Sequence, residues 1–293
     1  MDKSNKSDIS NKKLFYDRDF KIGERKEALN TKLAKQIFEE LEEFEGKGIE
    51  KIAQEYWLNK DTQDKLKQED IERNATERKV FDYYAATPQY LYELGYWEAQ
   101  DDKQREYRKL YLACKKFNLK RVLDYGGGIG GLPIYLNPKG ILCDYLDVPG
   151  RTFDFALFRF KKRGVEISCF DVTKSRHPVE PYDAVISYDV LEHVYDIDRT
   201  LDDIYSCLRQ GGIFIHRSTF ATGGIHLRKH ELYQDFNKFN EFLNSKKFSF
   251  IGRLKADRFS TFLNKAGLRN IIFSVRVSKR LKYGGNFLLH RKS

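Results

Sequence analysis

The segment 121–131 (RVLDYGGGIGG) holds the residues with the clearest capacity for chemistry. An apolar pair runs into an acid, Asp124, and glycines follow at Gly126, Gly128 and Gly130. Because glycine has no Cβ, the backbone of such a turn can bend tightly and approach a ligand. In open α/β folds, the turn after the first strand is where nucleotides bind. The segment therefore predicts a site for a nucleotide-type cofactor.

The turn alone leaves the identity of this cofactor open. Gly126, Gly128 and Gly131 also satisfy the pattern Gly-x-Gly-x-x-Gly of nicotinamide and flavin enzymes. A Walker-type phosphate loop is excluded, because no Gly-Lys-Ser/Thr follows. A plain tight turn in an α/β domain is the remaining alternative. The acids further along the chain must distinguish between these cofactors.

Two further acids stand at the ends of apolar segments. Asp147 ends the segment Cys143–Asp147 and lies 19 residues past Gly128. A carboxylate at that strand end can accept hydrogen bonds from both hydroxyls of a ribose, which fits either kind of cofactor. Asp171 ends the next apolar segment in the same way.

With two later segments, these motifs resemble the Rossmann-like (class I) S-adenosylmethionine-dependent methyltransferases. The spacing Asp-x-Gly-x-Gly-x-Gly matches the first motif of that family. Tyr182–Val194, with its Leu-Glu-His run, resembles the fourth-strand motif, and Leu208–Ile215 resembles the Leu-x-x-Gly-Gly entry to the fifth strand. The five segments occur in order over about residues 119–293.

The resemblance implies S-adenosylmethionine as the cofactor. It implies that Asp171 accepts a hydrogen bond from the adenine amino group, and that the Val172 N–H contacts the neighbouring ring nitrogen. The cofactor-binding residues that we expect are Asp124, Gly126, Gly128, Gly130, Asp147, Asp171, Val172 and Ser187.

Methyl transfer requires an acceptor held in line with the methyl group, and a base where the acceptor atom carries a proton. His226 and His230 follow a Gly-Gly pair at a spacing of four residues, so we take them as candidate catalytic residues. Tyr188, at the end of the fourth strand, is a third candidate. The alternative for His226 is a structural brace. We predict no metal site, because Glu192 and His193 are expected on a helix, where adjacent side chains diverge.

An aromatic segment, Tyr83–Trp97, is the candidate substrate wall, since five tyrosines and a tryptophan could line an apolar pocket with polar tips. Helical spacing places Tyr83, Tyr90 and Trp97 on one stripe, and we take these three as candidate substrate-binding residues. Packing of an amphipathic helix against the core explains such a stripe equally well.

Short apolar strands separated by helices must position these residues, a pattern that indicates a buried parallel sheet. Gly211-Gly212 is expected to end the helix before the fifth strand. The predicted strands are 121–124, 141–146, 165–170, 184–188 and 213–218. The predicted helices between and after them are 131–137, 151–163, 190–195 and 197–209.

The C-terminal part predicts a reversal of strand direction. A helix over 258–266 and a strand over 268–277 precede Gly284-Gly285-Asn286, which turns the chain into a last strand over 287–290. Strands joined in this way are antiparallel. A dinucleotide fold ends on a parallel strand instead, so this end favours the methyltransferases. We expect an α/β fold with a seven-stranded, mostly parallel Rossmann-like methyltransferase sheet, an antiparallel C-terminal hairpin and an N-terminal helical lobe.

The expected domain organisation follows from these elements. Residues 1–20 are polar and expected to be disordered, and 21–118 form a helical lobe or lid. The cofactor-binding methyltransferase domain covers 119–293, with a lid insertion at about 221–257. Within the lobe, a helix is marked by apolar residues three to four apart, and another begins at Thr87-Pro88.

The composition limits where the protein is expected in the cell and what it is expected to bind. No run of about 18 apolar residues exists and the N-terminus has no signal-peptide pattern, so we expect neither a membrane span nor export. Four scattered cysteines suggest reduced thiols in a cytoplasmic protein. The net charge is +10, and residues 246–293 hold thirteen Lys or Arg against one acid. This segment could attract an anionic partner, or it could be a solvated face.

Together these observations predict a methyltransferase that acts on a small-molecule or carrier-linked acceptor, which could be anionic. The basic segment suggests an RNA or protein methyltransferase as the alternative, but no RNA-binding module accompanies it, so nucleic acid is not favoured. A non-catalytic S-adenosylmethionine-binding partner protein is the third hypothesis, and a dehydrogenase is the fourth.

Overall fold

A computed structural model describes residues 31–52, 55, 76–174, 181–220, 226–256, 275–278 and 287–293. The segment 1–20 and the predicted helix 258–266 lie outside the described residues, so the expectations for them stay predictions. Within the described ranges, no helix is long and apolar enough to cross a membrane.

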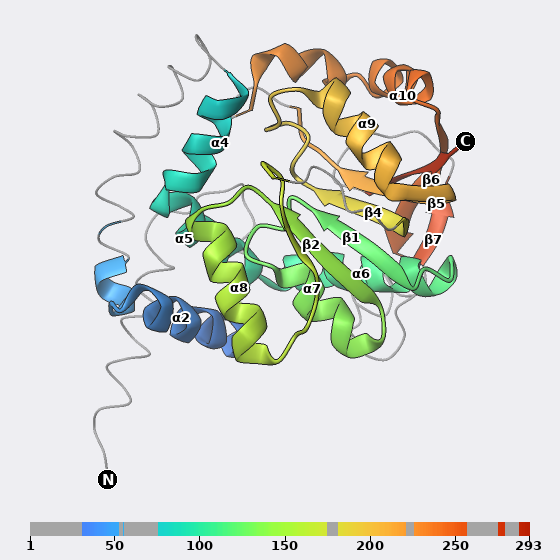
Figure 1. Cartoon of the computed structure of the whole chain (residues 1–293). Helices are drawn as coiled ribbons and strands as arrows, with labels where there is room; N and C mark the ends of the chain where they lie inside the picture. The colour runs from blue at the N-terminus through green and yellow to red at the C-terminus, as the bar shows by residue number, and fades with distance from the viewer. Residues whose placement is uncertain are drawn as a thin grey trace.

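A single eight-stranded sheet forms the centre of the molecule, in the order β3-β2-β1-β4-β5-β8-β6-β7 (Figure 1). The five strands from β3 to β5 are parallel and the rest antiparallel, which confirms the predicted Rossmann-like methyltransferase sheet. The strands are β1 (Arg121–Tyr125), β2 (Leu142–Asp147), β3 (Cys169–Asp171), β4 (Tyr182–Tyr188), β5 (Leu208–Arg217), β6 (Phe248–Ala256), β7 (Val275–Ser278) and β8 (Leu288–Lys292).

The antiparallel end of the sheet contains one strand more than expected. β6 lies inside the segment 221–257, which we expected to be a lid insertion, and both later strands pair with it rather than with each other. The alternation Phe248-Ser-Phe250 is the sequence signal for this strand. Phe248 is fully buried, so joining the sheet removes its ring from water.

Helices cover both faces of the sheet. α6, α7 and α8 pack on one face, around Leu110, Leu132 and Ala156, whereas α9 and α10 pack on the other, around Leu201 and Leu243. The helices of this region are α6 (Asp101–Lys116), α7 (Gly131–Leu136), α8 (Arg151–Arg163), α9 (Ile197–Cys207) and α10 (Phe236–Ser245), with short 3₁₀ helices at Asn137–Lys139 and Arg228–Gln234.

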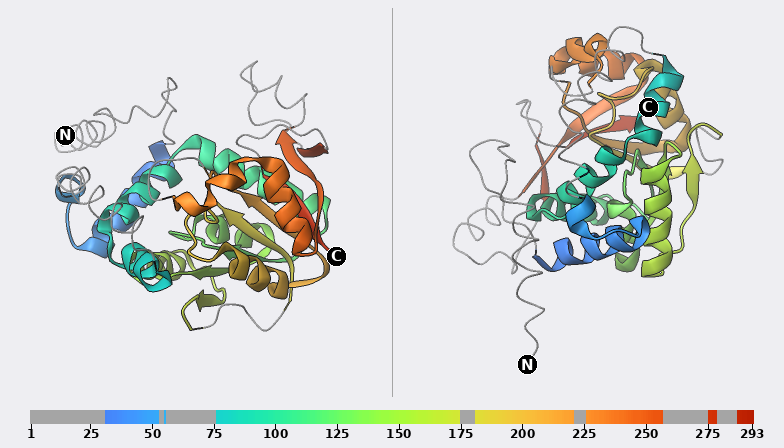
Figure 2. Two further views of the ribbon diagram at one scale, coloured as in Figure 1. Left: turned by 90° about the horizontal axis from the view of Figure 1, so that it is seen from above. Right: turned by 90° about the vertical axis from the view of Figure 1, so that its left-hand side faces the viewer.

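The N-terminal helices lie against α8, as Figure 2 shows from the side. They are α2 (Thr31–Glu45), α4 (Glu77–Ala86) and α5 (Pro88–Glu98). Ile37 and Leu41 of α2 share an apolar cluster with Phe155 of α8. A buried ion pair between Glu40 and Arg159 joins the same two helices at 2.9 Å. The described N-terminal region is therefore helical and packed onto the sheet domain.

Two local expectations were wrong. Residues 190–195 form turns instead of a helix. The helix before the fifth strand ends at Cys207, and Gly211-Gly212 lies inside β5. Gly211 has a φ of +71°, and the register between β4 and β5 shifts nearby, so the glycine accommodates an irregular strand instead of ending a helix.

Candidate active site

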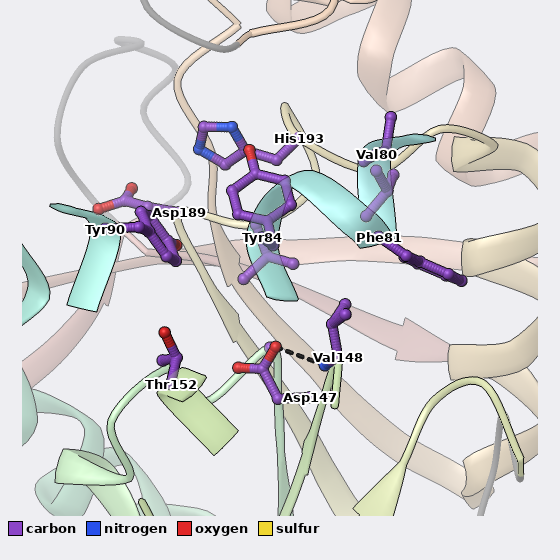
Figure 3. A pocket seen from close by; sticks show the side chains of 12 residues that line it. Val80, Phe81, Tyr84, Tyr90, Asp147, Val148, Thr152, Asp189 and His193 are labelled. Carbon is purple, nitrogen blue, oxygen red and sulfur yellow. Dashed lines mark hydrogen bonds between the residues drawn. The ribbon is translucent and has the colours of Figure 1, made fainter. Parts of the chain in front are cut away.

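A pocket opens at the carboxyl ends of β1, β2 and β4 (Figure 3). β1 lies between β2 and β4, so the strand order reverses here, and open α/β sheets bind ligands at this point. The pocket is lined by Val80, Phe81, Tyr84, Tyr90, Gly126, Asp147, Val148, Thr152, Asp189, Val190, His193 and Val194.

The glycine turn forms one side of this pocket. Gly126, Gly128 and Gly130 have φ values of +76°, +56° and +73°, which other residues rarely adopt. A Cβ on Gly126 would lie 2.6 Å from the Val190 side chain, so a larger residue would displace the opposite wall. The Gly126 N–H donates to the Leu146 carbonyl at 2.8 Å, which holds the turn against β2.

Asp147 points into the pocket from the end of β2 (Figure 3). Its Oδ2 accepts the Gly128 N–H at 2.5 Å and its Oδ1 accepts the Val148 N–H at 2.6 Å. Burial raises the pKa of Asp147 to about 6, although these hydrogen bonds oppose the rise. The carboxylate is therefore fixed at the place where the sequence predicted a ribose-binding acid.

Asp124 lies beneath the turn rather than on the pocket wall. Burial raises the pKa of Asp124 to about 8, while the nearby Lys103 ammonium acts in the opposite direction. Glu98 accepts the Tyr107 hydroxyl at 2.6 Å, and its carboxylate fills the space that a Cβ on Gly131 would need. The support of the turn by Glu98 and Lys103 was missed, because no motif marks these two residues on α5 and α6.

Five other expected cofactor residues do not line this pocket: Gly128 and Gly130 of the turn, and Asp171, Val172 and Ser187. Asp171 accepts the N–H and hydroxyl of Thr173 at 2.9 and 2.6 Å. The Val172 N–H donates to the Asp147 carbonyl at 3.0 Å, because the pairing of β2 and β3 extends to this residue. The Val172 N–H is thus already hydrogen-bonded in this structure. Contact with an adenine ring nitrogen would require that this hydrogen bond be shared or replaced. Ser187 is fully buried, and its Oγ has no hydrogen-bond partner.

Tyr188 packs between two cations. The Lys103 Nζ lies 3.5 Å from its ring centroid and the Arg217 Cζ lies 4.0 Å from it. The Phe287 ring packs edge to face with Tyr188, with ring centroids 4.9 Å apart. Burial raises the pKa of Tyr188 well above its ordinary value. Its phenol is therefore a poor candidate for a base, and the ring serves packing and cation–π contacts.

Tyrosines from α4 and α5 form the wall opposite the glycine turn. The centroid of the Tyr84 ring lies 5.0 Å from that of Tyr90 and 5.8 Å from that of His193. The Tyr84 hydroxyl points toward the His193 ring (Figure 3). Within the described ranges, the Tyr84 Oη is buried without a hydrogen-bond partner. Tyr90 thus lies where a substrate residue was expected, and Tyr84 is an additional wall residue.

The predicted aromatic stripe is broken between the two helices. Thr87 has extended backbone angles (φ −92°, ψ 99°), so α4 and α5 do not form one continuous helix. Tyr83 packs behind Tyr84, with ring centroids 5.2 Å apart. Trp97 lies beside Tyr96 and does not line the pocket.

Two histidines from separate segments meet at one end of this wall. The His193 and His226 rings lie 4.9 Å apart, and ligand atoms of Glu192, His193 and His226 all lie within 4.8 Å of one another. Glu192 is buried; its Oε1 accepts the Thr219 N–H at 2.8 Å. Because a turn replaces the expected helix, adjacent Glu192 and His193 converge, and the reason for excluding a metal site was wrong.

His230 is held away from this cluster. Its Nε2 donates to the Val194 carbonyl at 2.8 Å, and the residue is 4% exposed. Burial lowers the pKa of His230 below its ordinary value. This geometry fits a brace between the loop and the turn after β4 better than a catalytic base.

The family model described as "Methyltransferase domain" matches residues 96–271, more than half of the chain. No curated protein sequence matches.

Solved structures show similar folds. A S-adenosylmethionine-dependent methyltransferase of Clostridium acetobutylicum matches with a TM-score of 0.44 at 12% identity, over 63% of this chain and 89% of that one. The StiE O-MT structure matches with a TM-score of 0.44 at 18% identity, over 73% and 81%. The YcgJ protein of Bacillus subtilis matches with a TM-score of 0.40 at 17% identity, over 55% and 78%.

These distant structural likenesses carry no weight in assigning an activity, whereas the family match spans most of the sheet and the whole glycine turn. The chain belongs to the methyltransferase domain family and is an S-adenosylmethionine-dependent methyltransferase.

Proposed function

We propose that this enzyme methylates a small-molecule or carrier-linked acceptor whose reacting atom carries a proton. The observation that carries the proposal is the pocket itself. It holds Asp147 and Gly126 on one side, and Tyr84, Tyr90 and His193 on the other. One cavity thus offers a cofactor wall and an aromatic acceptor wall with ionisable groups.

The residues present fit the cofactor. Gly126 lines the pocket, where a side chain would press against Val190, and Asp147 presents a fixed carboxylate on the same wall. Asp147 would hold the ribose hydroxyls, and the turn would lie against the methionine part. When bound, the cofactor supplies a methyl group already activated by its sulfonium.

The chain's own residues would then orient the acceptor and move its proton. Tyr84 and Tyr90 would hold an apolar or aromatic acceptor by ring contacts. His193 and His226 are placed to take the proton as the bond from the acceptor atom to the methyl carbon forms and the carbon–sulfur bond breaks. The ammonium or hydroxyl proton ends on imidazole, so charge is conserved within the site.

The described part of the basic C-terminal segment supports a small acceptor over RNA. Lys246 pairs with Asp198 and Asp202 at 2.9 and 2.8 Å. The Lys292 ammonium donates to the Tyr205 and Leu208 carbonyls at 2.8 and 2.7 Å. These two cations serve contacts within the fold, whereas Lys279, Arg280 and Lys282 lie outside the described residues.

A cytoplasmic location remains part of the proposal. All four cysteines are free thiols, which fits the reducing compartment expected from their scattered positions.

The test is methyl transfer to a panel of acceptors. Purified enzyme is incubated with S-adenosylmethionine and with phenols, hydroxy acids, amines and carrier-linked acyl chains, and products are weighed by mass spectrometry. We expect one acceptor class to gain a methylene mass, and Gly128→Val to abolish the gain. Methylation of RNA or protein alone would move the assignment to the alternative. Cofactor binding with no methylated product from any class would favour a non-catalytic partner protein.

A further inference from the structure

Two segments that are distant in sequence place three metal-ligand side chains together beside the pocket. Glu192 and His193 come from the turn after β4, and His226 comes from the segment beyond β5. Their ligand atoms lie within 4.8 Å of one another. We propose that these residues bind one divalent transition-metal ion of the zinc type. Two imidazoles and one carboxylate are a donor set that such ions favour, and that hard ions such as Mg²⁺ do not.

The state of Glu192 is the first support for this site. The residue is 1% exposed, and its Oε1 accepts the Thr219 N–H at 2.8 Å. Its Oε2 is buried and has no hydrogen-bond partner among the residues that the structure describes. A buried carboxylate oxygen left unpaired is costly, and a metal ion would satisfy it. The Thr219 N–H would fix the carboxylate orientation, as outer hydrogen bonds do around metal ligands.

Tyr84 gives the second, independent support. Its hydroxyl is buried without a partner and points toward His193 (Figure 3). A water or acceptor oxygen on the metal would lie within the same end of the pocket and would give this hydroxyl a partner. Tyr84 thus contacts His193, and Glu192 belongs to the same cluster as His193 and His226.

The geometry requires only a small adjustment. Tetrahedral ligation with bonds of about 2.0–2.2 Å places neighbouring ligand atoms roughly 3.3–3.6 Å apart, so side-chain rotations would close the present separation. Asp189 is not available as a fourth ligand, because Arg217 holds both of its oxygens at 3.1 and 2.5 Å. Three protein ligands leave a position open, as in catalytic zinc sites.

The open position would face the acceptor, because His193 lines the pocket. A metal there would bind the acceptor oxygen or nitrogen and lower its pKa, so the acceptor proton would pass to solvent water before the methyl bond forms. His193 and His226 would then act as metal ligands and not as bases. This catalytic role rests on the proposed function. Metal binding does not, since it needs neither the cofactor nor an acceptor.

The experiment measures metal binding by the full chain without cofactor or acceptor. The protein is stripped with a chelator and titrated with Zn²⁺ by calorimetry, and with Co²⁺ by visible absorption, which reports tetrahedral nitrogen and oxygen ligation. We expect one equivalent of each to bind and Mg²⁺ not to compete. His226→Ala and His193→Gln should each weaken binding at least 100-fold.

His230→Gln is the matched control, because its amide can still donate to the Val194 carbonyl. It should bind metal as the wild type does. Binding of S-adenosylhomocysteine serves as the folding check for each variant. A wild-type protein that binds the cofactor product but neither Zn²⁺ nor Co²⁺ overturns the proposal, and so does binding unchanged by both histidine variants. In either case methyl transfer itself could still be observed, with the histidines acting as bases.

Discussion

The Gly128 N–H donates to the Asp147 Oδ2 at 2.5 Å, and this bond ties the turn after β1 to the end of β2. The Tyr145 hydroxyl donates to the Gly128 carbonyl at 2.7 Å from the same strand. Both polar groups of the Gly128 backbone are therefore fixed by β2. The cofactor wall is held in place before any ligand arrives.

Gly128→Val should abolish binding of S-adenosylhomocysteine in calorimetry. Gly128 has a φ of +56°, and an added Cβ would lie 3.2 Å from Leu94, so a branched side chain strains the turn that holds Asp147. Gly140→Val is the control, because Gly140 has a φ of +77° with nothing within 4 Å of its added Cβ. It should cost stability and keep cofactor binding. Normal affinity in Gly128→Val would remove the turn from the site.

Affinity for S-adenosylhomocysteine should fall as the pH falls through about 6. Burial raises the pKa of Asp147 to about 6, and only the ionised carboxylate can accept both ribose hydroxyls. Protonation therefore opposes binding, which should be roughly tenfold weaker at pH 5 than at pH 7 if this group alone titrates. Asp147→Asn should bind more weakly at pH 7 and lose this pH dependence. An Asn variant with the wild-type profile would assign the titration to another group.

Glu40→Ala should lower the free energy of unfolding by about 3–5 kcal/mol, because it leaves the Arg159 guanidinium buried without its carboxylate. Urea denaturation followed by circular dichroism measures this. Glu43→Ala is the control, since its partner Lys162 and Glu43 itself are 36% and 58% exposed. Exposed pairs contribute about 0–1 kcal/mol. Equal losses in the two variants would contradict the importance of burial.

The Glu40 pair should also weaken in acid. Burial alone would raise the pKa of Glu40, but Arg163 and Arg159 outweigh it and lower the pKa below its ordinary 4.5. A carboxyl with a lowered folded pKa contributes stability that is present above 4.5 and lost as pH falls below it. The difference in unfolding free energy between wild type and Glu40→Ala should therefore shrink below pH 4.5. A difference that stays constant to pH 3 would show that the pair does not titrate in this range.

His226→Ala should lower kcat by about 10²–10⁴ while leaving the affinity for S-adenosylhomocysteine intact, because it removes a proton acceptor or a metal ligand and not a cofactor contact. His230→Gln should keep kcat, since His230 bonds the Val194 carbonyl away from the cluster. Steady-state kinetics with the acceptor found in the panel measure both. Wild-type kinetics for His226→Ala would leave His226 as a brace.

The features that we assign to the cofactor were predictable from the sequence because they are local. Gly126, Gly128 and Gly130 have left-handed backbones in one short turn, and Asp147 ends the adjacent strand. Such features depend on conformations that few residue types adopt, so they leave a pattern in the chain. The parallel strands β1 to β5 left a similar pattern through their short apolar runs.

Only the tertiary structure brought together the residues that we propose for the acceptor. Glu192 and His193 converge because residues 190–195 form turns, and His226 reaches them from beyond β5. Lys103 lies near Asp124 through packing of α6, which no spacing along the chain encodes. β6 entered the sheet because burying Phe248 outweighed the polar residues around it. Local conformation is determined by a few neighbouring residues, whereas contacts between distant segments depend on how the whole chain packs. The proposed acceptor side of the pocket depends on contacts between distant segments.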